Sequence, residues 1–348
     1  MVVNFSMICS VKTLLVLRYL LLVLIYLNIK IFLFSQSYSI KGQLWATGVT
    51  VENQPNIMSQ LGYIPTISAY NKLSHDSMVD LEWAYRFDRS FKGDSPEEHH
   101  EKLYRGWLRY SNQVIEARFG LQKVSFGPAR VLRPLAWFDT IDPEDPTDQT
   151  DGVEAFRLRF FPSNSLALWT WIMKSESGTL SYGGRGEVST SLGEWGFTLH
   201  QAPDESNTQI GIDFRYDGFL GCWFEGAGSL SESQNISEDR YALITLGADY
   251  TFPIGTGLLI MSETLRIQEW SSKTDASSNR TISAFIAGLP IGMFHNIMLI
   301  TKLDWDQNNT YNYLRWSSTY DHFSINCMVS IGPSSDVNSL ELMFIYNH

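Results

Sequence analysis

Apolar and polar residues alternate with a period of two along most of the chain beyond residue 37. The segment 79–87, VDLEWAYRF, is a clear instance, because every second residue is large and apolar while mostly charged residues stand between. The same alternation recurs at 209–217, 242–252 and 322–331. Successive side chains of a β-strand point to opposite faces, so this period predicts strands with one apolar and one polar face. No convincing amphipathic helix follows residue 37.

The full set of such segments predicts an all-β fold of about 18 strands. Two segments are weaker than the rest, because Pro65 would remove a hydrogen-bond donor from one and Glu263 interrupts the apolar phase of another. A count of about 16 strands is therefore the alternative. The expected strands are 42–51, 60–72, 77–88, 103–110, 113–124, 153–162, 165–174, 184–191, 194–201, 207–217, 219–227, 240–252, 257–268, 280–289, 294–304, 311–318, 321–331 and 339–346.

The connections between these segments are short and long in turn. Short links lie near 74–76, 111–112, 162–164, 192–194, 217–218, 253–255, 290–293 and 318–320. Longer polar links lie at 89–101, 125–152, 175–183, 201–206, 228–238, 268–279, 306–310 and 332–338. Up-and-down outer-membrane barrels have short periplasmic turns and longer outer loops, whereas Greek-key sandwiches have no reason to keep this rhythm. We therefore expect a transmembrane antiparallel β-barrel with both chain ends on the short-turn side.

Aromatic residues favour a membrane barrel over a soluble core. They make up 14% of the chain, yet the mean hydropathy is only −0.11. A chain in which apolar and polar residues alternate has such an average hydropathy even when it is rich in aromatic residues. Many rings also flank the short links, where the interfacial girdle of a membrane barrel lies. These rings are Tyr110, Phe160, Phe161, Tyr216, Phe219, Tyr250, Phe252, Tyr320 and Phe323.

The first 37 residues resemble a secretion signal in their pattern. Lys12 precedes a long apolar stretch, and residues 35–37 offer small side chains at the spacing of a cleavage site. Arg18 and Lys30 interrupt the stretch, so a retained anchor helix is the alternative. Elsewhere no segment approaches the roughly 20 apolar residues that span a bilayer, which excludes a helical membrane bundle. We expect a signal peptide at 1–37 and a barrel at 38–348.

Charge and motif content exclude several classes of function. The chain has 26 Lys and Arg against 37 Asp and Glu, and this net charge of −11 argues against a nucleic-acid partner. Three cysteines are too few for a disulfide scaffold. No nucleophile elbow, phosphate loop or zinc spacing occurs, and residues 97–101, EEHHE, are expected to be a solvated loop. We therefore expect no enzymatic activity, no cofactor and no metal.

If the apolar phase of the strands faces lipid, the polar phase lines the interior. A charged side chain on the lipid face would cost about 2–4 kcal/mol at mid-bilayer, which supports this assignment. Arginines and acids then interleave along one wall and either select ionic solutes or only solvate and stiffen the lumen. The expected lining residues are Arg86, Arg105, Arg109, Glu116, Arg118, Arg157, Arg159, Asp213 and Arg215.

The longest link, 125–152, is a candidate constriction. Loops of this length are usually functional or disordered. It starts beside the arginine wall, so its acids could fold inward and narrow the pore; a solvated outer loop is the alternative. A calcium site is a third hypothesis, but the acids at 145, 148 and 151 lack the alternating spacing of an EF-hand loop. The candidate constriction residues are Asp139, Asp142, Glu144 and Asp145.

A known group of proteins has a similar stretch at this link. The chain has Arg118-Phe-Gly-Leu-Gln122, then Ser125-Phe-Gly127, Asp139, Asp142-Pro143 and Gly152-Val153. This resembles the R-x-G-x-Q … W-G … D-P … G-V stretch of large porin-like outer-membrane barrels, the alginate-export-like and related porin families. The resemblance implies an 18-stranded channel for anionic or small hydrophilic solutes, often with an arginine-lined constriction. It also implies that Arg118 and Gln122 face the channel and that 139–145 belong to an inward loop.

These observations predict an outer-membrane channel for passive diffusion of small hydrophilic, in particular anionic, solutes. The expected partners are outer-membrane lipid and lipopolysaccharide, the solute and the barrel-assembly machinery of a Gram-negative-type bacterium. Two alternatives stay open. One is a non-conducting barrel that anchors or organises surface polysaccharide, and the other is a secreted soluble β-sandwich or propeller.

Overall fold

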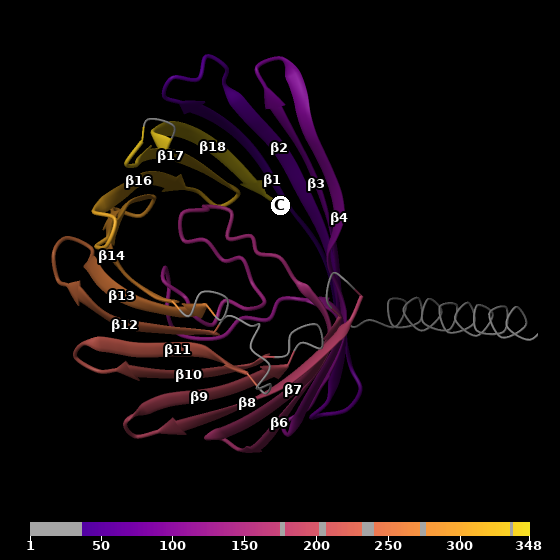
Figure 1. Cartoon of the computed structure of the whole chain (residues 1–348). Helices are drawn as coiled ribbons and strands as arrows, with labels where there is room; N and C mark the ends of the chain where they lie inside the picture. Colours follow the sequence, from indigo (N-terminus) through magenta and orange to yellow (C-terminus); the bar gives the residue numbers. More distant parts are fainter. Residues whose placement is uncertain (1–36, 175–177, 202–206, 232–239, 272–275, 335–336) are drawn as a thin grey trace, which may run out of the picture.

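The chain folds into a closed barrel of 18 antiparallel strands, in which each strand pairs with its neighbours in the sequence. A computed structural model describes residues 37–174, 178–201, 207–231, 240–271, 276–334 and 337–348. The strands β1 and β18 pair from Gln43↔Asn347 to Val51↔Ser339 and close the ring (Figure 1). Within these ranges no helix is long and apolar enough to cross a membrane.

The strands are β1 (Ser37–Val51), β2 (Met58–Lys72), β3 (Met78–Lys92), β4 (Ser95–Ser111), β5 (Ile115–Gln122), β6 (Val153–Ser163), β7 (Leu166–Lys174), β8 (Leu180–Thr190), β9 (Gly193–Gln201), β10 (Asn207–Asp217), β11 (Gly221–Ser231), β12 (Arg240–Phe252), β13 (Leu258–Ser271), β14 (Ala276–Ile291), β15 (His295–Asp304), β16 (Asn309–Thr319), β17 (Phe323–Ile331) and β18 (Ser339–Asn347).

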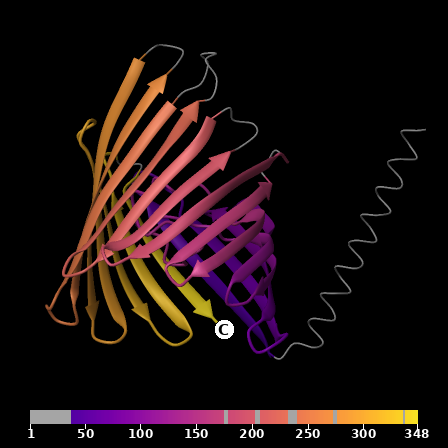
Figure 2. The ribbon, with the colours of Figure 1, turned by 90° about the horizontal axis from the view of Figure 1, so that it is seen from below.

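The predicted fold class and strand number are confirmed, and the alternatives of 16 strands, a sandwich or a propeller are wrong. Short turns gather at one end of the barrel together with the C-terminus (Figure 2). The predicted signal peptide lies outside the described residues, apart from Ser37 at the start of β1.

One predicted long link is a tight hairpin instead. Residues 89–101 form the ends of β3 and β4, which turn at Gly93 with a φ of 60°. The charged run 97–101 is strand, because the backbone ladder with β3 holds it; His99 and Glu101 also lie 2.9 Å apart along it. The alternation of short and long links fails at this turn.

Pro65 disturbs the sheet without ending a strand. The β2–β3 ladder pairs Tyr63 with Phe87 and Thr66 with Ala84 but skips the two residues between. A register shift in the β3–β4 ladder follows at Ala84/Tyr85. Proline has no N–H to donate, so the sheet absorbs it as a local break in one ladder.

The outer face of the barrel is apolar. The phase that alternates with the charged residues is exposed, with Trp83 at 42%, Phe119 at 60% and Leu246 at 61%. Rings near the short turns contact one another, as in Tyr250–Phe252 (4.7 Å between ring centroids). A continuous exposed surface of this kind requires an apolar surrounding such as lipid.

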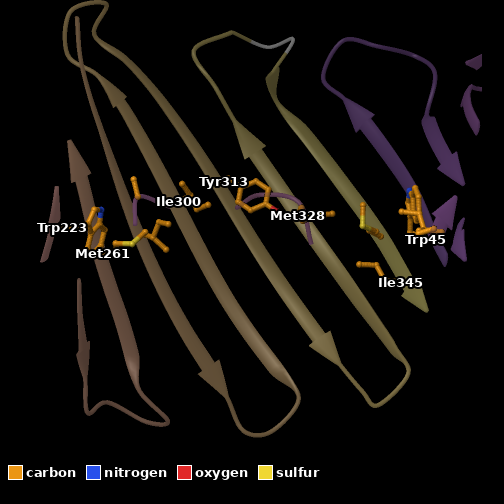
Figure 3. Packing of buried hydrophobic residues seen from close by; sticks show 12 residues of the cluster. Trp45, Trp223, Met261, Ile300, Tyr313, Met328 and Ile345 are labelled. Atoms are coloured by element: carbon orange, nitrogen blue, oxygen red, sulfur yellow. The ribbon is translucent and has the colours of Figure 1, made fainter. Parts of the chain in front are cut away.

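The inner face is not uniformly polar, which differs from the expected wet interior. On β18, Met343 and Ile345 are buried although the alternate residues Leu342 and Phe344 are exposed outside. A belt of such inward apolar side chains crosses neighbouring strands (Figure 3). We call it the apolar belt: Trp45, Ile64, Ala84, Trp223, Met261, Ile286, Ile300, Tyr313, Met328, Met343 and Ile345, with Ala129 packed among them.

Candidate functional site

A long piece of chain lies inside the barrel. Residues 123–152, which join β5 to β6 and which we call the inner segment, run within the ring of strands (Figure 1). Their polar contacts reach β1, β4, β11, β13, β15 and β16. A folded part of the protein therefore crosses the lumen, and it covers the apolar belt.

Two glutamates of the barrel wall hold the first half of the inner segment. Glu225 on β11 accepts hydrogen bonds from the N–H groups of Ala129 (3.0 Å) and Leu135 (2.6 Å). Glu263 on β13 accepts from three successive N–H groups, those of residues 130–132, at 2.6–2.9 Å. Both glutamates are fully buried. A buried carboxylate is stable only with such partners. The two glutamates therefore fix the backbone of residues 129–135, and that backbone in turn keeps the glutamates in place.

Glu144 attaches the middle of the inner segment to β15 and β16. Its carboxylate lies 2.5 Å from the Lys302 ammonium and accepts a hydrogen bond from the Tyr311 hydroxyl at 2.7 Å. Its carbonyl accepts another from the Tyr313 hydroxyl at 2.6 Å. The predicted constriction residue Glu144 is therefore bonded to the wall.

The end of the inner segment returns along β4 and β1. Lys102 on β4 pairs with Asp151 at 2.6 Å, and Arg105 donates to the Thr150 carbonyl at 2.7 Å. Gln43 on β1 donates to the Thr147 carbonyl at 3.2 Å. These bonds leave the segment tethered along its whole length.

An ion pair between Arg133 and Asp139 braces the inner segment internally. The Arg133 guanidinium also donates to the Ser125 hydroxyl at 3.0 Å. Burial on its own would raise the pKa of Asp139, but hydrogen bonds from Arg133 and Ser125 hold that pKa below its ordinary value of 3.8. Asp139 thus stays ionised wherever the pair is intact.

Asp142 and Asp145 shape two turns of the same segment. Asp142 accepts from the N–H of Glu144 at 2.9 Å, and Asp145 accepts from the N–H of Thr147 at 2.8 Å. Side-chain to backbone bonds of this kind are typical of Asx turns. Both carboxylates are engaged in holding the segment's shape.

Aromatic packing fixes the inner segment against β7. Phe126 and Phe138 lie 5.4 and 6.0 Å from the ring of Trp171, which is buried. Leu135 packs at Gly211 on β10, where a Cβ atom would overlap it. Apolar packing therefore holds the inner segment in addition to the hydrogen bonds and ion pairs.

Charged residues of β3–β6 form a network that we call the charged wall: Asp80, Glu82, Arg109, Glu116, Arg118, Arg157 and Arg159. Arg109 pairs with Asp80 at 2.6 Å and lies 3.5 Å from Glu116. Arg157 and Arg118 lie 2.9 and 3.8 Å from the same Glu116 carboxylate. One acid therefore serves three arginines.

Tryptophan rings lie under the arginines of the charged wall. Arg118 sits over Trp107 at 4.4 Å, and Arg159 and Arg157 sit over Trp169 at 4.0 and 5.0 Å. Among the described residues Arg159 makes no ion pair, and the buried Nε–H groups of these three arginines donate to no protein acceptor. The wall therefore has more guanidinium donors than acceptors.

The charged side continues along β8–β10. Arg185 pairs with Asp213 at 2.6 Å and with Glu187 at 2.8 Å. Arg215 lies 2.7 Å from Asp217. A cavity of about 380 Å³ lies between these strands and the start of the inner segment. It is the polar space that adjoins the inner segment on this side.

Three predicted lining residues have local partners. Arg86 pairs with Asp88 at 2.6 Å, and Arg105 bonds to the carbonyl groups of Tyr104 and Thr150. Gln122 is fully buried and donates to the Ala155 carbonyl at 3.0 Å, and its role in lining a channel stays a prediction. Its side chain ties β5 to β6 where the inner segment begins.

The sequence did not single out Glu225, Arg185, Lys302 and Tyr311. Glu263 did give a signal, because a lone acid stood in the apolar phase of its strand. In the period-two pattern this acid only weakens the strand and does not identify a partner. The other four follow the ordinary polar or mixed phase, so nothing in the sequence distinguished a residue that holds the inner segment from one that is merely hydrated.

In the part of the chain that the structure describes, no cluster of three His, Cys, Asp or Glu residues could hold a metal ion. The histidines of the 97–101 run form ion pairs with their neighbours Glu98 and Glu101.

Comparison with known structures identifies similar folds. No protein-family model and no curated protein matches the sequence. Crystal structures of three Pseudomonas aeruginosa proteins are similar over 90% of this chain: OpdK with vanillate (TM-score 0.65, 8% identity, 99% of that chain), OccD3 or OpdP (0.63, 11%, 92%) and OprD (0.61, 11%, 96%). At these identities the likeness is one of fold: an 18-stranded porin-like barrel.

Proposed function

We propose that this protein is a channel for passive diffusion of small hydrophilic solutes across an outer membrane, and that it prefers anions. The observation that carries the proposal is the combination of a closed barrel, an apolar outer face and a charged wall inside. A barrel of this size can hold a water-filled path, and fixed charges along such a path select solutes by sign.

The preference for anions rests on the donors of the charged wall. Its four arginines face three carboxylates, and Arg159 lies over the Trp169 and Phe161 rings and forms no ion pair among the described residues. A guanidinium held over a ring keeps its N–H groups for a carboxylate or phosphate. OpdK, which has a similar fold, was crystallised with vanillate, a carboxylate, and this supports the proposal.

Reconstitution into a planar lipid bilayer tests the proposal. We expect discrete current steps in KCl and, under a salt gradient, a reversal potential of the sign that marks chloride preference. Heat-modifiable migration on a gel serves as the control for a folded barrel. A folded protein that gives no current steps would refute the channel, and a cation-selective one would refute the preference.

The tethering of the inner segment favours a second candidate, a barrel that does not conduct and that anchors or organises surface polysaccharide. The segment contacts the wall on many sides, from Glu225 to Lys302 and Lys102. The same bilayer measurement separates the two, because a plugged barrel gives no steps at any voltage below rupture.

The proposed setting is the outer membrane of a Gram-negative-type bacterium. The apolar outer face and the rings at the short turns suit lipid and lipopolysaccharide, and a barrel in that membrane depends on assembly machinery for insertion. Fractionation of cells into inner and outer membranes tests this setting directly.

A further inference from the structure

We infer that Glu225 and Glu263 are the residues that position the inner segment, and thereby set the width of the path beside the charged wall. This inference rests on the proposed channel function. Neither glutamate belongs to the charged wall, and neither is exposed to a solute, since both are fully buried. Their role is therefore to hold another part of the protein.

The bonding pattern is directional and saturated. Five backbone N–H groups of residues 129–135 point at the two carboxylates. The Trp223 indole donates to Glu263 as well, at 3.2 Å. In the same stretch the Thr245 hydroxyl donates to the Leu132 carbonyl at 2.7 Å. Wall and segment thus exchange bonds in both directions.

The backbone at Gly127 is a second, independent sign of this fit. Gly127 has a φ of 80°, a conformation that other residues rarely adopt. A Cβ atom there would overlap the Glu225 carboxylate. The segment approaches the wall so closely at this point that only glycine fits between them.

Substitution by glutamine removes part of the positioning bonds while the size of the side chain is kept. A carboxylate offers acceptors on both oxygens, whereas glutamine presents one acceptor and an NH₂ group that opposes the segment's N–H donors. An orphaned backbone N–H must then find water, so the stretch 129–135 leaves the wall. Glu263→Asp keeps the charge but withdraws the carboxylate by one methylene.

Single-channel recording of the full-length protein, with polyethylene glycols of graded size as pore probes, tests the inference. For Glu225→Gln/Glu263→Gln we expect conductance to change by about twofold or more, with a shifted polymer size limit. Glu263→Asp should shift the limit in the same way. Glu341→Gln is the matched control, because among the described residues Glu341 accepts its side-chain hydrogen bond from Thr47 on the wall (2.8 Å) and none from the inner segment.

The variants separate three explanations. A purely electrostatic role predicts that Glu263→Asp behaves like the wild type, and a role in folding alone predicts lost heat-modifiable migration with no altered pore among the folded molecules. Either result overturns the inference, as does wild-type conductance in the folded double variant. Absence of current steps in the wild-type protein would instead count against the proposed channel itself.

Discussion

At the scale of single residues, the charged wall is governed by one acid. Glu116 lies within 4 Å of three arginines, and its side chain is 12% exposed. These three arginines share the Glu116 carboxylate. Arg159, the cross-strand partner of Glu116, lies over the Trp169 and Phe161 rings instead and forms no ion pair among the described residues. Loss of a single arginine or carboxylate from the charged wall should therefore alter the net charge that a passing ion meets.

Substitution at two positions should move ion selectivity in opposite directions. Arg159→Gln removes a guanidinium that has no ion pair among the described residues, so anion preference should fall severalfold with little effect on folding. Glu116→Gln should raise anion preference and lower the free energy of unfolding by about 3 kcal/mol, because three arginines lose their shared partner. Reversal potentials and urea titrations monitored by tryptophan fluorescence measure both effects.

The outward-facing Arg89 supplies the control for these two substitutions. It lies on the exposed phase of β3 and contacts His99 rather than the charged wall. Arg89→Gln should leave the reversal potential unchanged. If Arg159→Gln also leaves it unchanged, the arginine over Trp169 has a structural role only.

At the scale of elements, the inner segment depends on the Arg133–Asp139 pair. The pKa of Asp139 is lowered in the folded protein, so the pair stabilises the segment above the unfolded value of 3.8 and loses that effect as pH falls through the folded value. We therefore expect steady currents from neutral pH down to about pH 4 and noisier currents only below it.

Asp139→Asn provides the test of this pH dependence. The variant cannot ionise at position 139, so it should be noisy at neutral pH and change little on acidification. Equal noise in variant and wild type across the whole range would show that the pair does not control the segment. Recordings in symmetric KCl buffered at each pH supply the measurement.

The strands themselves could be predicted from the sequence, since period-two alternation is a local property. The segments 207–217 and 240–252 even have the predicted bounds. The 89–101 hairpin could not, because charged residues at a strand's end resemble a loop until the partner strand is known. The partners of the inner segment could not either: the bond between Leu132 and Thr245 joins residues 113 positions apart, and nothing local specifies it.

The sequence predicted the site less completely than the fold. Arg109, Glu116, Arg118 and Arg157 come together as one network, although their pore-lining role remains a prediction. Gln122 lies on the same face of β5 but is fully buried, and its amide bonds to the Ala155 carbonyl of β6. The sequence pattern gives the side of a strand on which a residue lies, but not what covers that side.

At the scale of the whole molecule, the interior is divided. The charged wall lies on β3–β6. The apolar belt, into which Ala129 of the inner segment packs, runs mainly over β11–β18 and β1–β2 (Figure 3). We therefore expect an aqueous path to lie off-centre, beside the charged wall. Eighteen strands give the barrel a large circumference, but the inner segment fills part of the space that they enclose.

Removal of the middle of the inner segment should show how much of the lumen it fills. Replacement of residues 129–147 by a short Gly-Ser linker should raise conductance severalfold, because the central obstruction is lost. It should also lower stability, since the apolar belt meets water at a cost of about 25 cal/mol per Å². Bilayer recording and binding of a hydrophobic dye to the detergent-solubilised protein measure the two effects. Unchanged conductance would place the path elsewhere.

The double-sided apolar strands have a consequence for biogenesis. β13, β15 and β18 carry apolar side chains on both faces, such as Ile300 inward and Leu299 outward. Strands of that kind adhere to one another until both faces are covered. Lipid can cover only the outside. The inner segment precedes these strands in the chain and carries the surface that covers their inner faces. We therefore expect it to serve as the template on which the last third of the barrel packs.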